Sequence, residues 1–385
     1  MNENNSILDK LIESKQMQEA TQFSPNEVIF NLFKHLSTKE RDILNRRFGL
    51  LGKKRETLEE IGSYYQITRE RIRQIEVATI RRLKEIQDFK KEVEGAEHNV
   101  GRLLNKHGGI MEQNHLLKEL LTFNDANPAN HQATIFILSQ LLNDKFDLVR
   151  GDDEINDSWK LPGFSLEILK ESLRHINNII GGENRLLTLD DLVKGFTQHE
   201  FYKTNKHIIT PGSSDDTISD EEFLRVLNSY LMISRKVNQN ILGEWGLTQW
   251  STIRPKRMGD KIYLILRRSG KPMHFTEIAD AINQASFDHK TAYPATIHNE
   301  LILDPRYVLV GRGIYALKEW GYQPGTVIDI VTEILQKSPN PLTKEEIMDK
   351  VLEQRMVRKS TILLALANRQ KIKRLPNGTY TLATK

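Results

Sequence analysis

The sequence predicts a mainly α-helical protein built from tandem helix-turn-helix and winged-helix modules, with small β-hairpins as wings. Two observations lead to this fold class. Residues 57–76 combine helix caps with spaced isoleucines, and four later stretches have the pattern of short hairpins. No run approaches the ~18 apolar residues that a membrane span requires. With 385 residues the chain is also too long for one small core.

The composition indicates a soluble protein and excludes several chemistries. Hydrophobic residues make up 38% of the chain, charged residues make up 28%, and cysteine is absent. Without cysteine there can be no disulfide, no thiolate zinc site and no cysteine nucleophile. Residues 1–26 are polar, and their opening MNENNSILDKLIESK lacks the basic-then-apolar order of a secretory signal. We therefore expect a cytoplasmic protein with no membrane partner.

Positive charge is concentrated toward the two ends of the chain. Lys and Arg outnumber Asp and Glu by 15 to 9 in residues 31–90 and by 22 to 13 in residues 251–385. Residues 95–250 instead carry 15 basic and 22 acidic residues. Basic blocks suit a polyanionic partner such as DNA, although an ordinary solvated surface can have the same composition.

Residues 57–76, TLEEIGSYYQITRERIRQIE, are interpreted as two short helices joined by a tight turn. Thr57 followed by Glu60 fits a capping box, and Thr68 can cap the second helix. Apolar residues fall on the first helix, in the turn and at i, i+3 on the second helix, as the inner face of a helix-turn-helix requires. These apolar residues are Ile61, Tyr65, Ile67, Ile72 and Ile75. Gly62 is expected where the two helices approach most closely.

The polar residues at the start of the second helix then form an outward ridge. With Ile72 and Ile75 turned inward, the ridge consists of Arg69, Glu70, Arg73 and Gln74. Arginine can bind guanine with two hydrogen bonds, glutamine can bind adenine, and glutamate accepts from the cytosine amino group. A recognition helix contacts base edges of double-stranded DNA at this position. A solvated helical face is the alternative interpretation.

Residues 36–84, LSTKERDILNRRFGLLGKKRETLEEIGSYYQITRERIRQIEVATIRRLK, resemble region 4 of sigma-70 family RNA polymerase sigma factors. The resemblance includes RRFGL, TLEEIG and TRERIRQIE. Region 4 of that family reads the promoter −35 element and rests on the flap of the polymerase β subunit. The resemblance implies base contacts by Arg69, Glu70, Arg73 and Gln74. It also implies backbone or phosphate contacts by Lys39, Thr57, Leu58 and Glu59.

The sequence departs from the family pattern at two positions. Lys39 stands where many members carry arginine, and lysine reaches a phosphate only as a point charge. Gln66 lies in the turn, where Gly, Asp or Asn would adopt a left-handed backbone more easily. The resemblance covers about an eighth of the chain. Nothing elsewhere resembles sigma region 2, which melts the −10 element and grips the polymerase clamp.

From about residue 97 onward the chain repeats one plan, in which helices are followed by a short apolar hairpin. The hairpin stretches are KFDLVRGDDEINDSWKL (145–161), YLMISRKVNQNILGEWGL (230–247), RYVLVGRGIYALKEWG (306–321) and KIKRLPNGTYTLAT (371–384). This order is typical of winged-helix domains. The predicted organisation is a polar segment at 1–26, the sigma region 4-like module at 27–94, and winged-helix-like modules at 97–162, 164–250, 257–321 and 323–385. The second of these winged-helix-like modules includes an acidic loop at 211–222.

Residues 258–321 resemble the HARE-HTH winged helix. The resemblance lies in KIYLILRRSGKPMHFTEIADAINQ (261–284) and TIHNELILDPRYVLVGRGIYALKEWG (296–321). That module occurs in the δ subunit of Gram-positive RNA polymerase and in some DNA-modifying and chromatin proteins. The resemblance therefore leaves open whether these residues contact polymerase or DNA.

The sequence contains no motif that indicates catalysis. The eleven histidines are scattered without HExxH spacing, which argues against a metal site. GRG at 311–313 lacks the rest of a dinucleotide-binding fingerprint. Neither a nucleophile–base pair nor paired carboxylates occur at suggestive spacing. We expect no enzymatic activity, no cofactor and no small-molecule substrate.

We interpret the chain as a DNA-binding transcription factor that acts with bacterial RNA polymerase and reads −35-type promoter DNA. Two alternatives remain open. In the first, the chain is a δ-like polymerase accessory subunit whose sigma-like module rests on the β flap. In the second, it is the DNA-binding subunit of a DNA-processing or restriction system.

Overall fold

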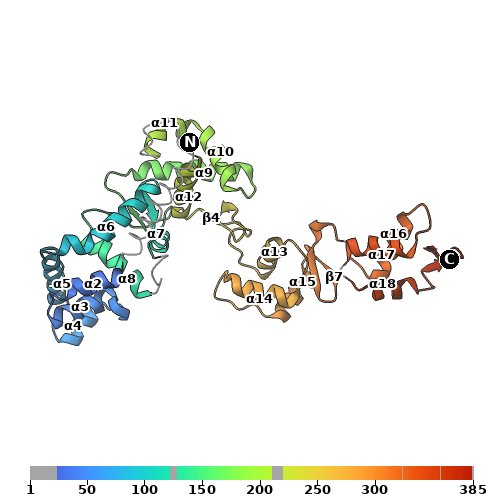
Figure 1. Cartoon of the computed structure of the whole chain (residues 1–385), viewed down its shortest axis with the longest axis horizontal. Helices are drawn as coiled ribbons and strands as arrows, with labels where there is room; N and C mark the ends of the chain where they lie inside the picture. The colour runs from blue at the N-terminus through green and yellow to red at the C-terminus, as the bar shows by residue number, and fades with distance from the viewer. Residues whose placement is uncertain (1–23, 122–127, 210–219, 323, 356, 384–385) are drawn as a thin grey trace, which may run out of the picture. The chain divides into compact units, whose positions relative to one another are not determined.

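A computed structural model describes residues 24–121, 128–209, 220–322, 324–355 and 357–383. The chain divides into two compact units, residues 1–238 and 239–385, and each is described by itself (Figure 1). Within the described ranges, no helix has the length and apolar character that crossing a membrane requires. The predicted polar segment up to residue 23 and the predicted acidic loop up to residue 219 lie outside the described residues.

The first unit opens with a group of short helices. They are α2 (Pro25–Phe33), α3 (Thr38–Phe48), the 3₁₀ turn η1 (Leu50–Gly52), α4 (Leu58–Tyr65) and α5 (Arg69–Lys84). The predicted capping box at Thr57 and Glu60 begins α4. Thr68 caps α5, and its hydroxyl accepts from the Arg71 amide. The helix-turn-helix predicted at residues 57–76 is therefore confirmed.

The rest of the first unit consists of further helices and small strands. The next elements are α6 (Phe89–Lys106), β1 (Ile110–Glu112), α7 (Gln113–Leu120), α8 (Pro128–Phe136), the π-helical turn η2 (Ile137–Leu141), β2 (Asp147–Val149) and β3 (Ser158–Lys160). They are followed by α9 (Leu166–Glu183), α10 (Leu189–Gln198), α11 (Glu200–Ile209), α12 (Asp220–Ile233) and β4 (Val237–Gln239). The boundary between the two units runs through β4.

The two hairpins predicted at 145–161 and 230–247 differ in detail from the structure. β2 and β3 confirm the hairpin at 145–161, but β1 also pairs with β3, so that Met111 and Leu148 both lie opposite Trp159. The stretch 230–247 was predicted to begin with a strand. Its first residues instead extend α12 because Leu227, Tyr230 and Leu231 are all buried at helical spacing.

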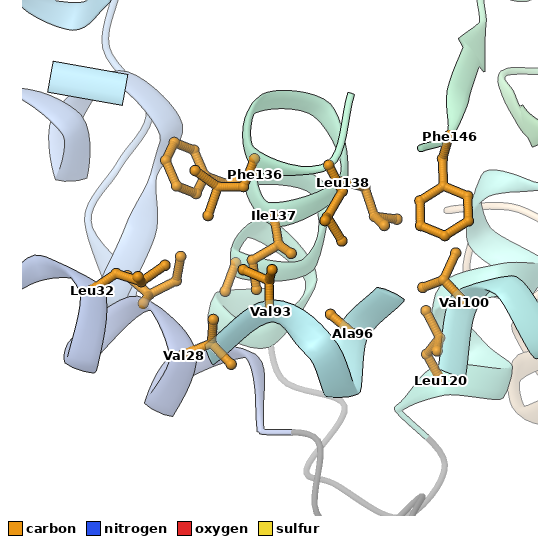
Figure 2. Close-up of a cluster of buried hydrophobic side chains, with 14 of the residues drawn as sticks. Val28, Leu32, Val93, Ala96, Val100, Leu120, Phe136, Ile137, Leu138 and Phe146 are labelled. Atoms are coloured by element: carbon orange, nitrogen blue, oxygen red, sulfur yellow. The ribbon is translucent and has the colours of Figure 1, made fainter. Parts of the chain in front are cut away.

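The helices around the helix-turn-helix, together with the end of α5, share one hydrophobic core with the segment that follows. This core joins residues of α2, α3 and α5 to residues of α6, α7, α8 and η2. Figure 2 shows the part of the core where α2 and α6 meet α8 and η2. The Phe136 ring, at the end of α8, has its centre 4.8 Å from that of Phe48 and 6.1 Å from that of Phe33. α6 also runs through the boundary expected between residues 94 and 97. The module boundaries themselves stay predictions.

The second unit contains two groups of three helices, each followed by a hairpin. The first group has β5 (Trp245–Leu247) before it and consists of α13 (Met258–Ser269), β6 (Met273–His274), α14 (Phe275–Ala285), α15 (Pro294–Leu303), β7 (Tyr307–Gly311), β8 (Ile314–Leu317) and η3 (Lys318–Trp320). The second consists of α16 (Val327–Lys337), α17 (Lys344–Gln354), α18 (Lys359–Leu366), β9 (Ile372–Arg374) and β10 (Tyr380–Leu382). Each group has its own hydrophobic core. The mainly α-helical fold class with small hairpins is confirmed.

Phe136→Ala should destabilise the helix-turn-helix, although Phe136 lies outside it in sequence. Removing a buried phenylalanine leaves a cavity and costs about 3–5 kcal/mol. Hydrogen exchange of the full-length chain should show a matching loss of protection in α3 and α5. Phe30 is the matched control because it lies on α2 and is 58% exposed. Phe30→Ala should change protection by about 0.5 kcal/mol or less. Unchanged protection of α3 and α5 in Phe136→Ala would show that these helices fold independently of α8.

Candidate nucleic-acid interface

The turn between α4 and α5 depends on two backbone features. A Cβ placed on Gly62 would lie 2.7 Å from the backbone oxygen of Ile67, which is closer than side chains approach. The Ile67 amide donates to the Gly62 carbonyl at 2.9 Å. The close helix approach predicted at Gly62 is therefore confirmed. Gln66 has φ +55°, so it adopts the left-handed conformation that the turn was expected to need.

An apolar inner face holds α5 against the rest of the helix-turn-helix. Ile43, Ile61 and Ile72 are fully buried in one cluster. The partly buried residues packed against it are Leu58, Tyr65, Ile67 and Ile75. The predicted inner face is thus confirmed, and Ile43 from α3 adds a contact that the pattern within residues 57–76 could not reveal.

Ion pairs between α3 and α5 fix the position of α5 along its length. Arg47 Nε lies 3.3 Å from a Glu76 carboxylate oxygen, and Arg82 Nη2 lies 2.7 Å from Glu40 Oε2. Arg82 pairs with the same carboxylate that closes the capping box of α3. The buried face and these pairs leave the start of α5 free to point outward.

The predicted base-contacting residues all lie exposed in the first two turns of α5. Arg73 donates two hydrogen bonds to Glu70, from Nε at 2.9 Å and from Nη2 at 2.7 Å. This hydrogen bonding lowers the pKa of Glu70 and raises the pKa of Arg73. Gln74 Oε1 accepts from Arg71 at 3.1 Å. Because the Arg73–Glu70 pair is exposed, its net worth is small and a base can replace Glu70 as the acceptor.

The predicted backbone-contacting residues lie at the starts of α3 and α4. Lys39 is in the first turn of α3, and its Nζ lies 5.1 Å from the centre of the Tyr65 ring. Thr57 caps α4, and Leu58 and Glu59 begin it. The Leu58 side chain packs against the inner cluster, so Leu58 can meet a phosphate only through its backbone amide. The first amides of a helix have no partner within the helix and favour anions.

A polar cluster that the sequence reading missed fixes the end of α4 against α3. Asp42 Oδ2 accepts from Tyr65 Oη and from Arg46 Nε, both at 2.7 Å. Burial and the Asp42 hydrogen bond raise the pKa of Tyr65 to about 12. The i, i+4 spacing of Asp42 and Arg46 was the only signal in the sequence. Across the described residues, no group of three or more histidines and carboxylates is placed to hold a metal ion.

Comparison with known proteins places the similarity on this interface. Residues 32–85 match the family described as sigma-70, region 4. RNA polymerase sigma factor SigA of Nostoc sp. is 42% identical over 85 residues, which cover 21% of this chain and 22% of that protein. SigA of Microcystis aeruginosa and SigA of Synechocystis sp. are each 41% identical over 85 residues, covering 21% of this chain and 20% of those proteins. The chain thus spans about a fifth of the length of these relatives. The resemblance of residues 258–321 to HARE-HTH stays a prediction.

Gly62→Ala and Gly95→Ala should change stability in opposite directions. A methyl group at Gly62 would press on the Ile67 carbonyl and should cost about 1–3 kcal/mol. Gly95 lies in α6, and a Cβ there would meet nothing within 4 Å. Gly95→Ala should therefore gain about 0.5–1 kcal/mol from helix propensity. Calorimetric unfolding of the full-length variants measures both effects, and a Gly62→Ala chain as stable as the parent would contradict the close approach.

Proposed function

We propose that the chain binds double-stranded DNA through α5, reads −35-type promoter sequences and acts with bacterial RNA polymerase in transcription initiation or its regulation. One observation carries this proposal. Arg69, Glu70, Arg73 and Gln74 share the exposed start of a helix whose opposite face is buried. The match of residues 32–85 to sigma-70 region 4 supports the same function.

The proposed contacts divide into positioning and reading. The starts of α3 and α4 bring Lys39 and the Leu58 and Glu59 amides to phosphates, which fixes register without sequence information. α5 then enters the major groove with its first two turns. On a guanine, Arg73 exchanges its two hydrogen bonds with Glu70 for two with the base, and Glu70 becomes free to accept from a neighbouring cytosine.

We also propose that the sigma-like module contacts the polymerase, with the β flap as the expected surface. The names of the matched relatives support a polymerase partner. The apolar side of the module is covered by α8 and η2 of the same chain. A polymerase contact must therefore use the outer surface of the module or displace α8. Purification from native lysate treated with nuclease tests this partner. Recovery of polymerase would support a direct contact that does not depend on DNA. Absence of polymerase would show that the two proteins associate only through DNA.

Arg73→Ala should weaken the best DNA site by roughly tenfold to a hundredfold and relax preference at one base pair. The reason is the loss of a bidentate arginine–guanine contact. Arg81→Ala is the matched control, because Arg81 forms a similar exposed pair with Glu85 (3.1 Å) at the other end of α5. Competition binding on a library of duplexes measures preference. An Arg73→Ala chain that keeps the parental preference would show that α5 does not read bases.

Lys39→Ala and Ile72→Ala should weaken binding for two other reasons. Loss of a phosphate contact by Lys39 should weaken all sequences alike and reduce the slope of log affinity against log salt by about one unit. Loss of the fully buried Ile72 side chain leaves a cavity, so binding and melting temperature should fall together. Duplex binding at several salt concentrations, combined with thermal melts, separates the two effects. A Lys39→Ala chain with a changed base preference would contradict the phosphate role.

The chain with core polymerase should not open a promoter unaided. The segment shared with the matched sigma factors spans only about a fifth of their length. Promoter melting in the sigma-70 family belongs to region 2, which no other part of this sequence resembles. Permanganate footprinting detects unpaired thymines in such a mixture, and a complete sigma factor serves as the positive control. A bubble formed without any other sigma factor would overturn this expectation.

A further inference from the structure

Charge is divided sharply within the last helix-hairpin group of the chain. Residues 327–354 carry three basic and six acidic residues. Residues 355–385 carry eight basic residues and no acidic residue. The first stretch holds α16 and α17, and the second holds α18 and the β9–β10 hairpin. Residues 355–385 therefore supply eight of the nine net positive charges of residues 251–385.

Two of these basic residues bind backbone or carboxylate groups, and Arg374 lies over the Tyr380 ring at 6.0 Å. Arg355 is buried and donates to the carbonyls of Leu309 and Gly325. Lys371 lies 3.1 Å from Asp329 of α16. The other described cations are exposed, and none has a carboxylate partner within the described part of the chain. These are Arg358, Lys359, Arg369, Lys373 and Arg374, which we call the C-terminal cationic surface.

The fold presents these cations on both the helix and the hairpin. Arg358 occupies the N-cap of α18 and Lys359 its first turn, while Ile362 and Leu366 turn into the core. The helix start adds its own positive dipole to the two side chains. In the hairpin, Ile372 is buried, and Lys373 and Arg374 are exposed beside it. The helix start and the hairpin therefore each offer exposed positive charge to phosphates.

The third helix of the preceding helix-hairpin group lacks such cations. This helix, α15, contains no lysine or arginine between Pro294 and Leu303. It exposes Ile302 and Leu303 instead, at 62% and 78%. The cations on α18 are therefore particular to the last group and do not follow from the shared fold.

We propose that α18 and the β9–β10 hairpin form a second DNA-binding surface, which contacts the sugar-phosphate backbone of double-stranded DNA without reading bases. The absence of acidic residues from 355–385 favours a densely anionic partner. The acidic residues of α16 and α17 repel the same partner and so orient the group with α18 toward it. The charge distribution alone favours an anionic partner. The choice of duplex DNA over another polyanion rests in addition on the proposed function of α5.

The test uses the full-length chain with Arg358→Gln, Lys373→Gln and Arg374→Gln combined. The matched control combines Lys337→Gln, Lys344→Gln and Lys350→Gln, which removes the same charge from α16 and α17. The salt dependence of binding is measured on a duplex with a preferred site and on an unrelated duplex. The surface variant should lower the slope of log affinity against log salt by about two to three units on both duplexes. The control should leave the slope within about one unit of the parent.

Other outcomes would overturn the proposal. An unchanged slope would show that the surface does not contact DNA. The proposed function of α5 would not be affected, because it is tested separately by the base preference of Arg73→Ala. Weaker binding to RNA with unchanged binding to duplex DNA would make this an RNA surface. Loss of polymerase capture alone would make it a protein surface. If the triple variant unfolds, Lys359→Gln with Arg369→Gln provides a second variant with an expected slope change of about two units.

Discussion

The packing of α8 against α2 and α3 is the constraint on which the DNA-facing part of the molecule depends. Phe136 brings the end of α8 between Phe33 and Phe48, and the same core continues through α6 to Trp159. α3 in turn carries Ile43, which packs against Ile61 and Ile72. Phe136 therefore supports the orientation of α5 indirectly, through its contact with α3. The stability of the reading helix is therefore coupled to a segment that supplies none of its proposed DNA contacts. A cut near residue 95 would pass through α6 and open this core.

Local signals were enough to predict the helix-turn-helix, because its determinants lie within a few residues of one another. Capping boxes, isoleucine spacing and the small residue at Gly62 each act over one or two turns. Contacts over long sequence distances were not predictable in this way. β1 pairs with β3, and the Phe136 ring packs against the rings of Phe33 and Phe48. Each contact joins segments far apart in the sequence, and a local hydrophobic pattern does not predict such pairs. At residues 230–233 both strand and helix suited the apolar residues, and burial of Tyr230 beside Gly108 decided for the helix.

The candidate site was predicted in its residues but not in its interactions. The inward turn of Ile72 determines that Arg69 and Arg73 face outward, and this follows from helical geometry alone. The hydrogen bonds between Arg73 and Glu70 follow from i, i+3 spacing and could have been expected. The Asp42 cluster could not, because Tyr65 reaches Asp42 from another helix. That cluster matters for the proposed reading of DNA because it fixes the end of α4, from which the strained Gln66 leads into α5.

The proposed interface also implies a division of labour along the chain. A few bidentate contacts by α5 discriminate between bases, but most affinity of DNA-binding proteins comes from phosphate neutralisation and is salt-dependent. The sigma-like module carries 15 basic residues between positions 31 and 90, but several of them are already paired with Glu40, Glu56 and Glu76. The exposed cations at the start of α18 and on β9 can add phosphate contacts, because they offer positive charge without a base-reading face. The two proposed DNA contacts lie in different units of the chain and can be altered separately. α15, in the same unit as α18, exposes apolar residues instead. Sequence preference and salt dependence should therefore respond to different substitutions, as expected when reading and holding DNA are assigned to separate surfaces.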